Sequence, residues 1–170
     1  MPSVDLHLRQ ASPADAEEVA RVYVASWNEG FGHLMAPRVL NADQVTRWSR
    51  DLQAGPARWW LVESGESVVG FAGTRASRDP TEPGLGELDT IAVAPPAWRR
   101  GVGRRLMDRA LDDLRESGYQ QGILWTLARY EQGRAFYEAT GWRASGELRD
   151  AGQQIGFRRA LSTLSGGDIG

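Results

Sequence analysis

Two glycines, Gly101 and Gly103, lie where a strand-like pattern gives way to a helical one near the middle of the chain. Glycine lets the backbone turn sharply and approach a ligand closely, because it carries no Cβ. The free N–H groups and the positive dipole at a helix start favour an anion. Arginines add positive charge around this point: Arg99, Arg100, Arg104 and Arg105. The pattern predicts a site for a phosphorylated ligand, and a solvated arginine-rich helix start is the alternative.

The spacing excludes two better-known phosphate loops. A dinucleotide-binding fingerprint requires a third glycine where this chain has Leu106, and a Walker loop ends in Gly-Lys-Ser or Gly-Lys-Thr. Taken alone, the residues therefore predict an anion site and leave its ligand open.

The composition limits the chemistry that such a site can perform. The chain has no Cys, and all of its 20 basic Lys or Arg residues are Arg. A covalent Cys intermediate, a disulfide, a Schiff base and a lysine base are all excluded. The two histidines, His7 and His33, are too few for a typical zinc site, so we expect no metal.

Charge and hydropathy bear on partners and location. A net charge of −2 and a pI near 5.7 argue against a general nucleic-acid binder. No apolar run approaches the roughly 18 residues of a membrane span, and the first residues lack a signal-peptide pattern. We therefore expect a cytoplasmic protein with one domain over 1–163 and a flexible tail over 164–170.

The hydrophobic periodicities predict a mixed α/β domain in the order β-α-α-β-β-β-α-β-α-β-β, without internal repeats. Strands are expected over residues 6–10, 58–63, 67–74, 85–94, 121–127, 142–148 and 154–160. A first helix is expected to begin at Ser12, which would be its N-cap, with Pro13 as the first helical residue. Three more helices are expected over 41–54, 102–116 and 131–140. Asn41 is the expected N-cap of the second helix, and Gly118 and Gly141 are expected to end the last two.

Two stretches resemble the motifs of the GNAT superfamily of acyl-CoA-dependent N-acyltransferases. Residues 86–95 (GELDTIAVAP) with 98–107 (WRRGVGRRLM) resemble its acyl-CoA signature, and 135–142 (AFYEATGW) resemble its last helix and the strand after it. The predicted order of elements is also the GNAT order, over nearly the whole chain. The resemblance implies a single mixed sheet, mostly antiparallel, of about six to seven strands flanked by about four helices.

The resemblance also implies acetyl-CoA as the ligand. In the family, the pyrophosphate lies on backbone amides of the glycine loop, which here comprises Arg99, Arg100, Gly101, Val102, Gly103 and Arg104. The pantetheine arm pairs with the central strand, here Ile91, Ala92 and Val93. Two positions depart from the family pattern. Trp98 replaces the usual Gln or Arg, and Tyr130 replaces an Asn that often contacts the cofactor arm, which leaves that contact open.

Catalytic roles follow from the same resemblance. Tyr137 matches the tyrosine that often acts as general acid, and we expect its hydroxyl in the cleft with Phe136 buried. Glu87 matches a strand carboxylate used as general base by some relatives, and burial would raise its pKa toward neutrality. Asp89, on the same strand face, and a water relay remain alternatives. A backbone N–H near Ala92 or Val93 is expected to meet the acetyl carbonyl oxygen.

The acceptor pocket is expected between the first two helices and their connecting loop. Its candidate residues are Trp27, Asn28, Phe31 and His33, with Trp59 or Trp60 behind them. An aromatic pocket near carboxylates suits an amine, although aromatic residues at helical spacing also suit core packing.

These patterns together indicate an acetyltransferase that moves an acetyl group from acetyl-CoA directly to a primary amine of a small molecule or peptide, in a ternary complex. The alternative is a non-catalytic domain that binds acyl-CoA as a sensor or scaffold. The identity of the acceptor and the acyl length remain open, and a homodimer through the terminal strands is plausible.

Overall fold

The computed structural model describes residues 5–79 and 81–161, so the expected tail over 164–170 and the expected domain end at residue 163 lie outside the described residues. Seven strands occur, namely β1 (Leu6–Gln10), β2 (Arg58–Ser64), β3 (Ser67–Ala76), β4 (Leu85–Val93), β5 (Gln121–Leu127), β6 (Arg143–Arg149) and β7 (Gln154–Ala160). The α-helices are α1 (Ala16–Phe31), α2 (Ala42–Ala54), α3 (Val102–Glu116) and α4 (Glu131–Ala139). Two short 3-10 helices cover Pro13–Asp15 and Pro95–Ala97.

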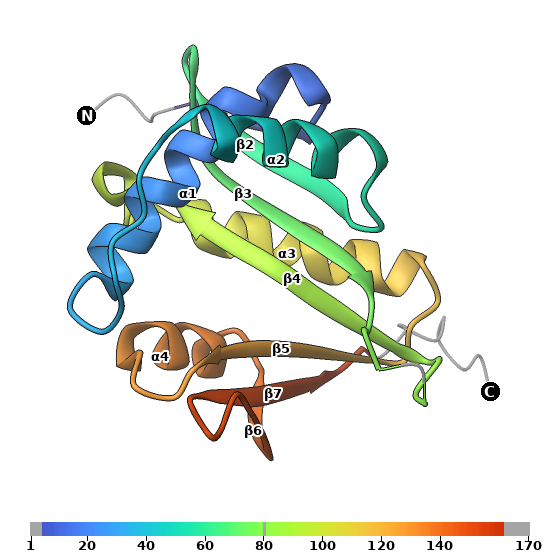
Figure 1. Cartoon of the computed structure of the whole chain (residues 1–170). Coiled ribbons are helices and arrows are strands. Elements are labelled where there is room, and N and C mark those ends of the chain that lie inside the picture. Colours follow the sequence, from blue (N-terminus) through green and yellow to red (C-terminus); the bar gives the residue numbers. More distant parts are fainter. Residues whose placement is uncertain (1–4, 80, 162–170) are drawn as a thin grey trace.

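All seven strands belong to one sheet, in the order β1-β2-β3-β4-β5-β7-β6 (Figure 1). Within the described residues, the central pair β4–β5 is the only parallel pair, and all the other neighbouring strands pair antiparallel. The predicted mixed, mostly antiparallel sheet with four flanking helices is therefore confirmed. The ends of the strands lie within two residues of the predicted ends.

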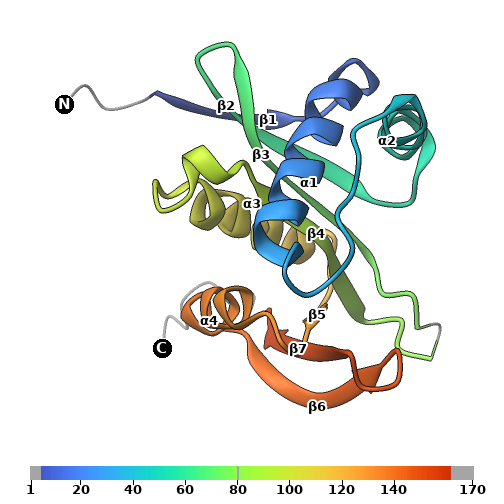
Figure 2. The same cartoon turned by 60° about the vertical axis from the view of Figure 1, so that its left-hand side comes forward.

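Helices cover both faces of the β1–β4 half of the sheet, with α1 and α2 on one face and α3 on the other (Figure 2). Side chains along a strand alternate between the two faces. Leu61 and Phe71 accordingly join the core beneath α1 and α2, whereas Val62 and Ala72 join the core beneath α3. In the described part of the chain, no helix is long and apolar enough to cross a membrane.

The first helix begins differently from its prediction. Pro13 does follow Ser12, but residues 13–15 form a 3-10 turn and the α-helix starts at Ala16. The Asp15 carboxylate accepts a 2.8 Å bond from the Ser12 N–H and is also held by Arg9 of β1. This ion pair lowers the pKa of Asp15 and ties the helix start to the edge of the sheet. Asn41 caps α2 as predicted, accepting a 2.9 Å bond from the Gln44 N–H.

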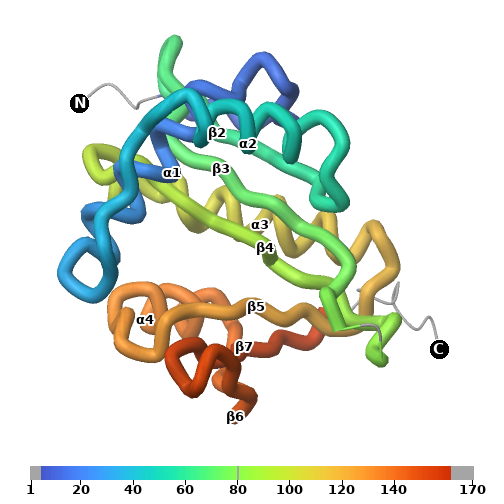
Figure 3. The backbone as a smooth tube through the Cα atoms, in the orientation of Figure 1, coloured from blue at the N-terminus to red at the C-terminus, as the bar shows by residue number. Residues whose placement is uncertain are grey.

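The parallel pair β4–β5 opens along its length. The two strands pair only at residues 85–87 of β4, and then diverge toward the end where α1 and α4 lie (Figure 3). Near the point of divergence, the pairing between β3 and β4 shifts register. Gly73 pairs with Thr90 and Thr74 pairs with Leu88, so Asp89 has no partner on β3 and forms a β-bulge. Bulges bend a strand and are frequent beside active sites. The backbone of β4 beyond residue 88 is therefore free of strand partners on its β5 side.

Candidate functional site

The glycine loop joins β4 to α3 through a strained turn. Gly101 is the N-cap of α3 with φ +82°, and Arg99 has φ +63°, a conformation that is uncommon for a residue with a side chain. The first helical bond is donated by the Arg105 N–H to the Gly101 carbonyl, at 3.0 Å. The N–H groups of residues 102–104 consequently have no partner within the helix and point out of its positive end.

Gly103 keeps the space beside this helix end open. A Cβ added there would lie 3.3 Å from Cζ of Phe136 on α4 and 3.7 Å from Cγ2 of Val93 on β4. Trp98, which departs from the family pattern, has a structural contact that sequence reasoning did not foresee: its Nε1 donates a 2.6 Å bond to the Val93 carbonyl. The indole thus ties the loop to the end of β4.

A first cavity, which we name the glycine-loop cavity, lies between the end of β4, the glycine loop and α4, and has a volume of about 300 Å³. Its wall consists of Ser26, Ile91, Ala92, Val93, Ala97, Trp98, Arg99, Gly101, Gly103, Arg104, Tyr130, Gln132, Gly133, Phe136 and Tyr137. Arg99, Arg100 and Arg104 are exposed, and none has a carboxylate within 4.0 Å among the residues that the structure describes. The mouth of this cavity is therefore positively charged.

The backbone of β4 supplies further donors to the gap between β4 and β5. The Ala94 N–H donates to Val69 of β3 at 2.8 Å, which fixes the alternation of the antiparallel ladder. Ala92 therefore directs its N–H toward β3, whereas Ile91 and Val93 direct theirs toward the gap. Of the two amides expected to meet a carbonyl oxygen, the one on Val93 faces the open side.

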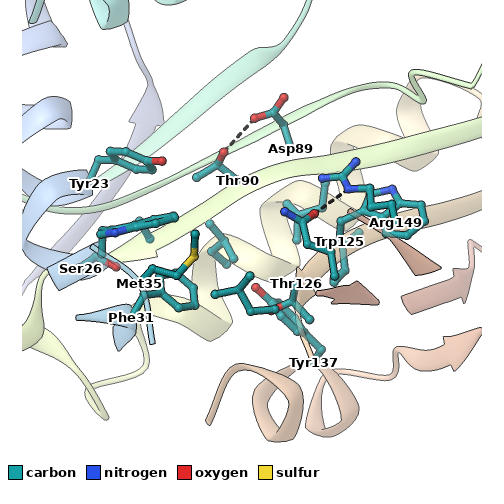
Figure 4. A pocket seen from close by; sticks show the side chains of 17 residues that line it. Tyr23, Ser26, Phe31, Met35, Asp89, Thr90, Trp125, Thr126, Tyr137 and Arg149 are labelled. Atoms are coloured by element: carbon teal, nitrogen blue, oxygen red, sulfur yellow. Dashed lines mark hydrogen bonds between the residues drawn. The ribbon is translucent and has the colours of Figure 1, made fainter. Parts of the chain in front are cut away.

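A second cavity, which we name the strand-gap cavity, lies between α1, β4 and β5 and has a volume of about 270 Å³ (Figure 4). Its wall consists of Tyr23, Ser26, Trp27, Phe31, Met35, Leu88, Asp89, Thr90, Ile91, Ala92, Leu124, Trp125, Thr126, Leu127, Tyr137, Arg149 and Gln154. Four residues line both cavities: Ser26, Ile91, Ala92 and Tyr137. The two cavities therefore share a wall, and Tyr137 is the side chain with a titratable proton at that wall.

Tyr137 is held in place by aromatic packing. Its ring centroid lies 5.7 Å from that of Phe136 and 6.0 Å from that of Phe157 on β7. Phe136 and Tyr137 are both partly buried, so the structure does not separate them into one core residue and one cleft residue. Burial, followed by the nearby Tyr130, raises the pKa of Tyr137 above the usual value near 10. The hydroxyl therefore stays protonated and available as a donor at neutral and mildly alkaline pH.

The two candidate carboxylates of β4 occupy different environments. Asp89 lines the strand-gap cavity and accepts bonds from the Thr90 hydroxyl at 2.8 Å and from Arg78 at 2.9 Å. Glu87 is 4% exposed, lies 3.4 Å from Arg78, and is absent from the described walls of both cavities. Burial raises the pKa of Glu87 despite the attraction of Arg78. Asp89 thus reaches the cavity directly, and Glu87 lies behind it on the same strand face.

The expected acceptor residues divide into two pairs. Trp27 and Phe31 lie in the wall of the strand-gap cavity. Asn28 does not, because its side-chain amide donates to the Arg38 carbonyl at 2.9 Å and accepts from the Arg38 N–H at 2.7 Å, which fastens the α1–α2 loop. His33 is exposed and outside the described cavity wall.

The two tryptophans expected behind this pocket face opposite sides of the sheet. Trp59 packs against Trp48 of α2, with ring centroids 5.1 Å apart, in the core beneath α1 and α2. Trp60 instead lies under Arg109 of α3, at 4.3 Å. Neither lines the strand-gap cavity within the described part of the chain.

Sequence reasoning missed several residues of the strand-gap cavity, among them Tyr23, Ser26, Met35, Trp125 and Arg149. Tyr23 stands one helical turn before Trp27, so the helical period offered a signal for it. Arg149 offered none, because only the pairing of β6 with β7 and of β7 with β5 brings it beside Trp125.

Tyr130, at the position of the missing Asn, lies at the junction of α1 and α4. It is the N-cap residue of α4 and lines the glycine-loop cavity. Its ring meets that of Phe31 edge-on, with centroids 4.4 Å apart, so it joins the two cavity regions by packing. Burial raises the pKa of Tyr130, which keeps its hydroxyl neutral.

Comparison with known proteins gives consistent results. The family described as "Acetyltransferase (GNAT) family" matches residues 16–142. The chain is 31% identical over 124 residues to N-alpha-acetyltransferase RimI of Mycobacterium tuberculosis, covering 71% of this chain and 68% of that protein. It is 26% identical over 152 residues to a second protein of that organism, named "Probable N-acetyltransferase", covering 86% and 84% of the two chains.

A solved structure shares the fold at lower identity. The PaiA N-acetyltransferase of Thermoplasma acidophilum, in complex with coenzyme A, superposes with a TM-score of 0.71 and 15% identity, covering 92% of this chain and 99% of that one.

Proposed function

The chain belongs to the GNAT family of acetyltransferases and is an acyltransferase, and from this premise we propose that it transfers an acetyl group from acetyl-CoA to a primary amine of a small molecule or peptide. We propose that the transfer is direct, within a ternary complex, and the absence of Cys removes an acyl-enzyme route through that residue type. The observation that carries the proposal is the wall shared by the two cavities, where a donor and an acceptor would meet.

The glycine-loop cavity suits acetyl-CoA. Residues 102–104 offer unpaired N–H groups at the positive end of α3, and Gly103 leaves the space that a side chain would fill against Phe136. The exposed guanidinium groups of Arg99 and Arg104 suit the phosphates. The acceptor amine would occupy the strand-gap cavity.

The chemistry needs few groups. Acetyl-CoA supplies an acetyl thioester: its carbon–sulfur bond breaks, a carbon–nitrogen bond forms, the nitrogen loses a proton and the sulfur gains one. The N–H of Val93 is available to hold the carbonyl oxygen, an oxyanion-type contact that strengthens as charge develops. The neutral hydroxyl of Tyr137 donates a proton to the sulfur as the carbon–sulfur bond breaks, and the phenolate then regains a proton from solvent.

A carboxylate on β4 receives the amine proton. Asp89 lies in the cavity wall, where its carboxylate accepts bonds from Arg78 and from the Thr90 hydroxyl. Burial raises the pKa of Glu87, which is the direction that favours a base, but Glu87 does not line the described wall of the strand-gap cavity. We propose that a water molecule relays the proton to this pair.

Calorimetric titration with acetyl-CoA, followed by release of free thiol in the presence of a panel of amines, tests this function. We expect tight, salt-sensitive binding of acetyl-CoA and amine-dependent thiol release. If the protein binds acetyl-CoA but Tyr137→Phe leaves the turnover of every amine unchanged, the assigned catalytic role is wrong. If acetyl-CoA does not bind, the whole proposal fails.

A further inference from the structure

We propose that Arg149 is the anchor for a carboxylate on the acceptor, and that the acceptor is a small apolar α-amino acid or a short peptide with such a residue. The inference rests on the proposed acetyl transfer and adds the chemical class of the acceptor. The same site then requires two features of one molecule, an amine at the shared wall and an anion at Arg149.

Arg149 reaches the strand-gap cavity from the last residue of β6. Its backbone pairs with Gln154 of β7, which in turn pairs with Leu127 of β5. The side chain returns across β7 so that the guanidinium lies 4.6 Å above the ring of Trp125, and its Nε donates a 2.6 Å bond to Oε1 of Gln154 (Figure 4). Two neutral groups thus orient the guanidinium, whose two terminal nitrogens are left for a ligand.

Among the described residues that line the strand-gap cavity, Arg149 carries a positive charge without forming an ion pair. Arg78 lies 2.9 Å from Asp89 and 3.4 Å from Glu87, and Arg75 lies 3.9 Å from Asp89. These two arginines balance the two carboxylates. Among the residues that the structure describes, Arg149 has no carboxylate within 4.0 Å. The Arg149 side chain is exposed at the rim of the cavity, yet desolvation lowers its pKa more than the attraction of Glu87 and Asp150 raises it, and a bound anion would oppose that shift.

Arg158 on the neighbouring strand shows what a structural arginine looks like in this protein. It bonds the carboxylate of Glu82 at 2.8 and 2.9 Å and that of Glu147 at 2.7 and 3.0 Å, which ties β7 to β6 and to the loop before β4. These carboxylates raise the pKa of Arg158, whereas the pKa of Arg149 is lowered. Arg149 therefore has the surroundings of a binding group rather than those of a strand fastener.

The rest of the cavity defines the body of the acceptor. Apolar and aromatic side chains lie across the cavity from Arg149, including Tyr23, Phe31 and Met35 (Figure 4). Trp27 also lines this cavity. The volume of about 270 Å³ is slightly below the roughly 300–1,000 Å³ typical of ligand pockets. A small apolar side chain fits these surroundings, with the amine directed to Tyr137 and the carboxylate to Arg149.

The test uses matched pairs of acceptors with the purified full chain and acetyl-CoA: leucine with leucinamide, phenylalanine with phenylalaninamide, and the dipeptide Leu-Leu with its amide. Thiol release gives kcat/KM for each. We expect Arg149→Gln to lower kcat/KM for at least one acid by about tenfold to a hundredfold, and for its amide by less than about threefold. Arg149→Lys should restore part of the loss. Because each variant is compared with the wild type on the same acceptor, the different basicity of the amines in acids and amides does not affect the result.

Arg143→Gln is the control, because Arg143 is an exposed arginine of the same strand that lines neither described cavity. The inference is wrong if Arg149→Gln affects acids and amides equally, affects neither, or does no more than Arg143→Gln.

Binding of N-acetylleucine and N-acetylleucinamide to the CoA-loaded protein, measured by calorimetry, separates the two proposals. Binding of the acid that depends on Arg149, without turnover of any amine, supports the anchor and contradicts the proposed transfer. Turnover of amines without any preference for the acid supports the proposed acetyl transfer and contradicts Arg149 as the carboxylate anchor. If neither acid nor amide binds and no amine is turned over, both proposals fail.

Discussion

The glycine-loop cavity and the strand-gap cavity share a wall but are built in opposite ways. The first is formed largely by one continuous stretch, 91–104, and offers backbone N–H groups at a helix start. The second takes side chains from α1, the loop after it, β4, β5, α4, the end of β6 and the start of β7, which are far apart in the sequence. A site made of backbone tolerates many side chains around it, whereas a site made of side chains changes with each substitution. This difference suits one constant ligand and one variable ligand.

Gly103→Val should have the largest effect, and on the glycine-loop cavity alone. The added atoms would press on Phe136 and fill the space before the helix start. We expect acetyl-CoA to bind about a hundredfold more weakly, measured by calorimetry, because several charge-assisted bonds are lost together. Gly84→Val is the control, since a Cβ at that exposed glycine meets nothing within 4 Å. Equal affinities in both variants would remove the glycine loop from the binding site.

Tyr137→Phe should act at the shared wall. The aromatic packing against Phe136 and Phe157 is kept, so the affinity for acetyl-CoA should stay within about twofold while kcat falls by about ten- to a hundredfold. Tyr119→Phe, at a partly buried tyrosine that lines neither described cavity, is the matched control. A loss of affinity without a loss of kcat would contradict the role of Tyr137 as a proton donor.

Glu87→Gln sharpens the assignment of the base through pH. Because burial raises the pKa of Glu87 in the folded state, the folded protein holds this proton more tightly than the unfolded chain does. Ionisation of Glu87 therefore costs stability as pH rises from the unfolded pKa, near 4.5, through the folded one. We expect the wild-type melting temperature to fall relative to that of Glu87→Gln across this window, measured by calorimetry.

The same substitution should also change the rate. If Glu87 is the final proton acceptor, the acidic limb of kcat/KM against pH should disappear in Glu87→Gln and remain in Asp89→Asn. The opposite pattern would assign the proton to Asp89, which lines the cavity itself.

Arg104→Gln should have the smallest effect. Its side chain is exposed at the mouth of the glycine-loop cavity, where solvent and salt screen its charge. We expect acetyl-CoA to bind about two- to fivefold more weakly at low salt, with less difference at high salt. Arg50→Gln, an exposed arginine of α2 that lines neither described cavity, should leave the affinity unchanged. If Arg104→Gln weakened acetyl-CoA binding more than Gly103→Val does, the arginine side chain would contribute more to binding than the backbone of the glycine loop.

The difference between the cavities also explains how much the sequence could predict. The strands, the four α-helices and the glycine loop follow from local periodicity, caps and turn residues, and the structure confirms them. The resemblance to the GNAT motifs predicts the cofactor contacts on β4 and at the start of α3, and these contacts stay predictions. The strand-gap cavity was not predictable, because the bulge at Asp89 and the divergence of β4 from β5 depend on pairing between distant strands. Asn28 illustrates the limit: its position suggests the pocket, but its amide bonds to Arg38.

A crystal structure of the protein with CoA and an N-acetylated amino acid bound together would test the central claim most directly. We expect the CoA sulfur at the wall formed by Ser26, Ile91, Ala92 and Tyr137, and the acetylated amine on the other side of it in the strand-gap cavity. A sulfur atom far from these residues, or an acetylated product outside the strand-gap cavity, would contradict that claim.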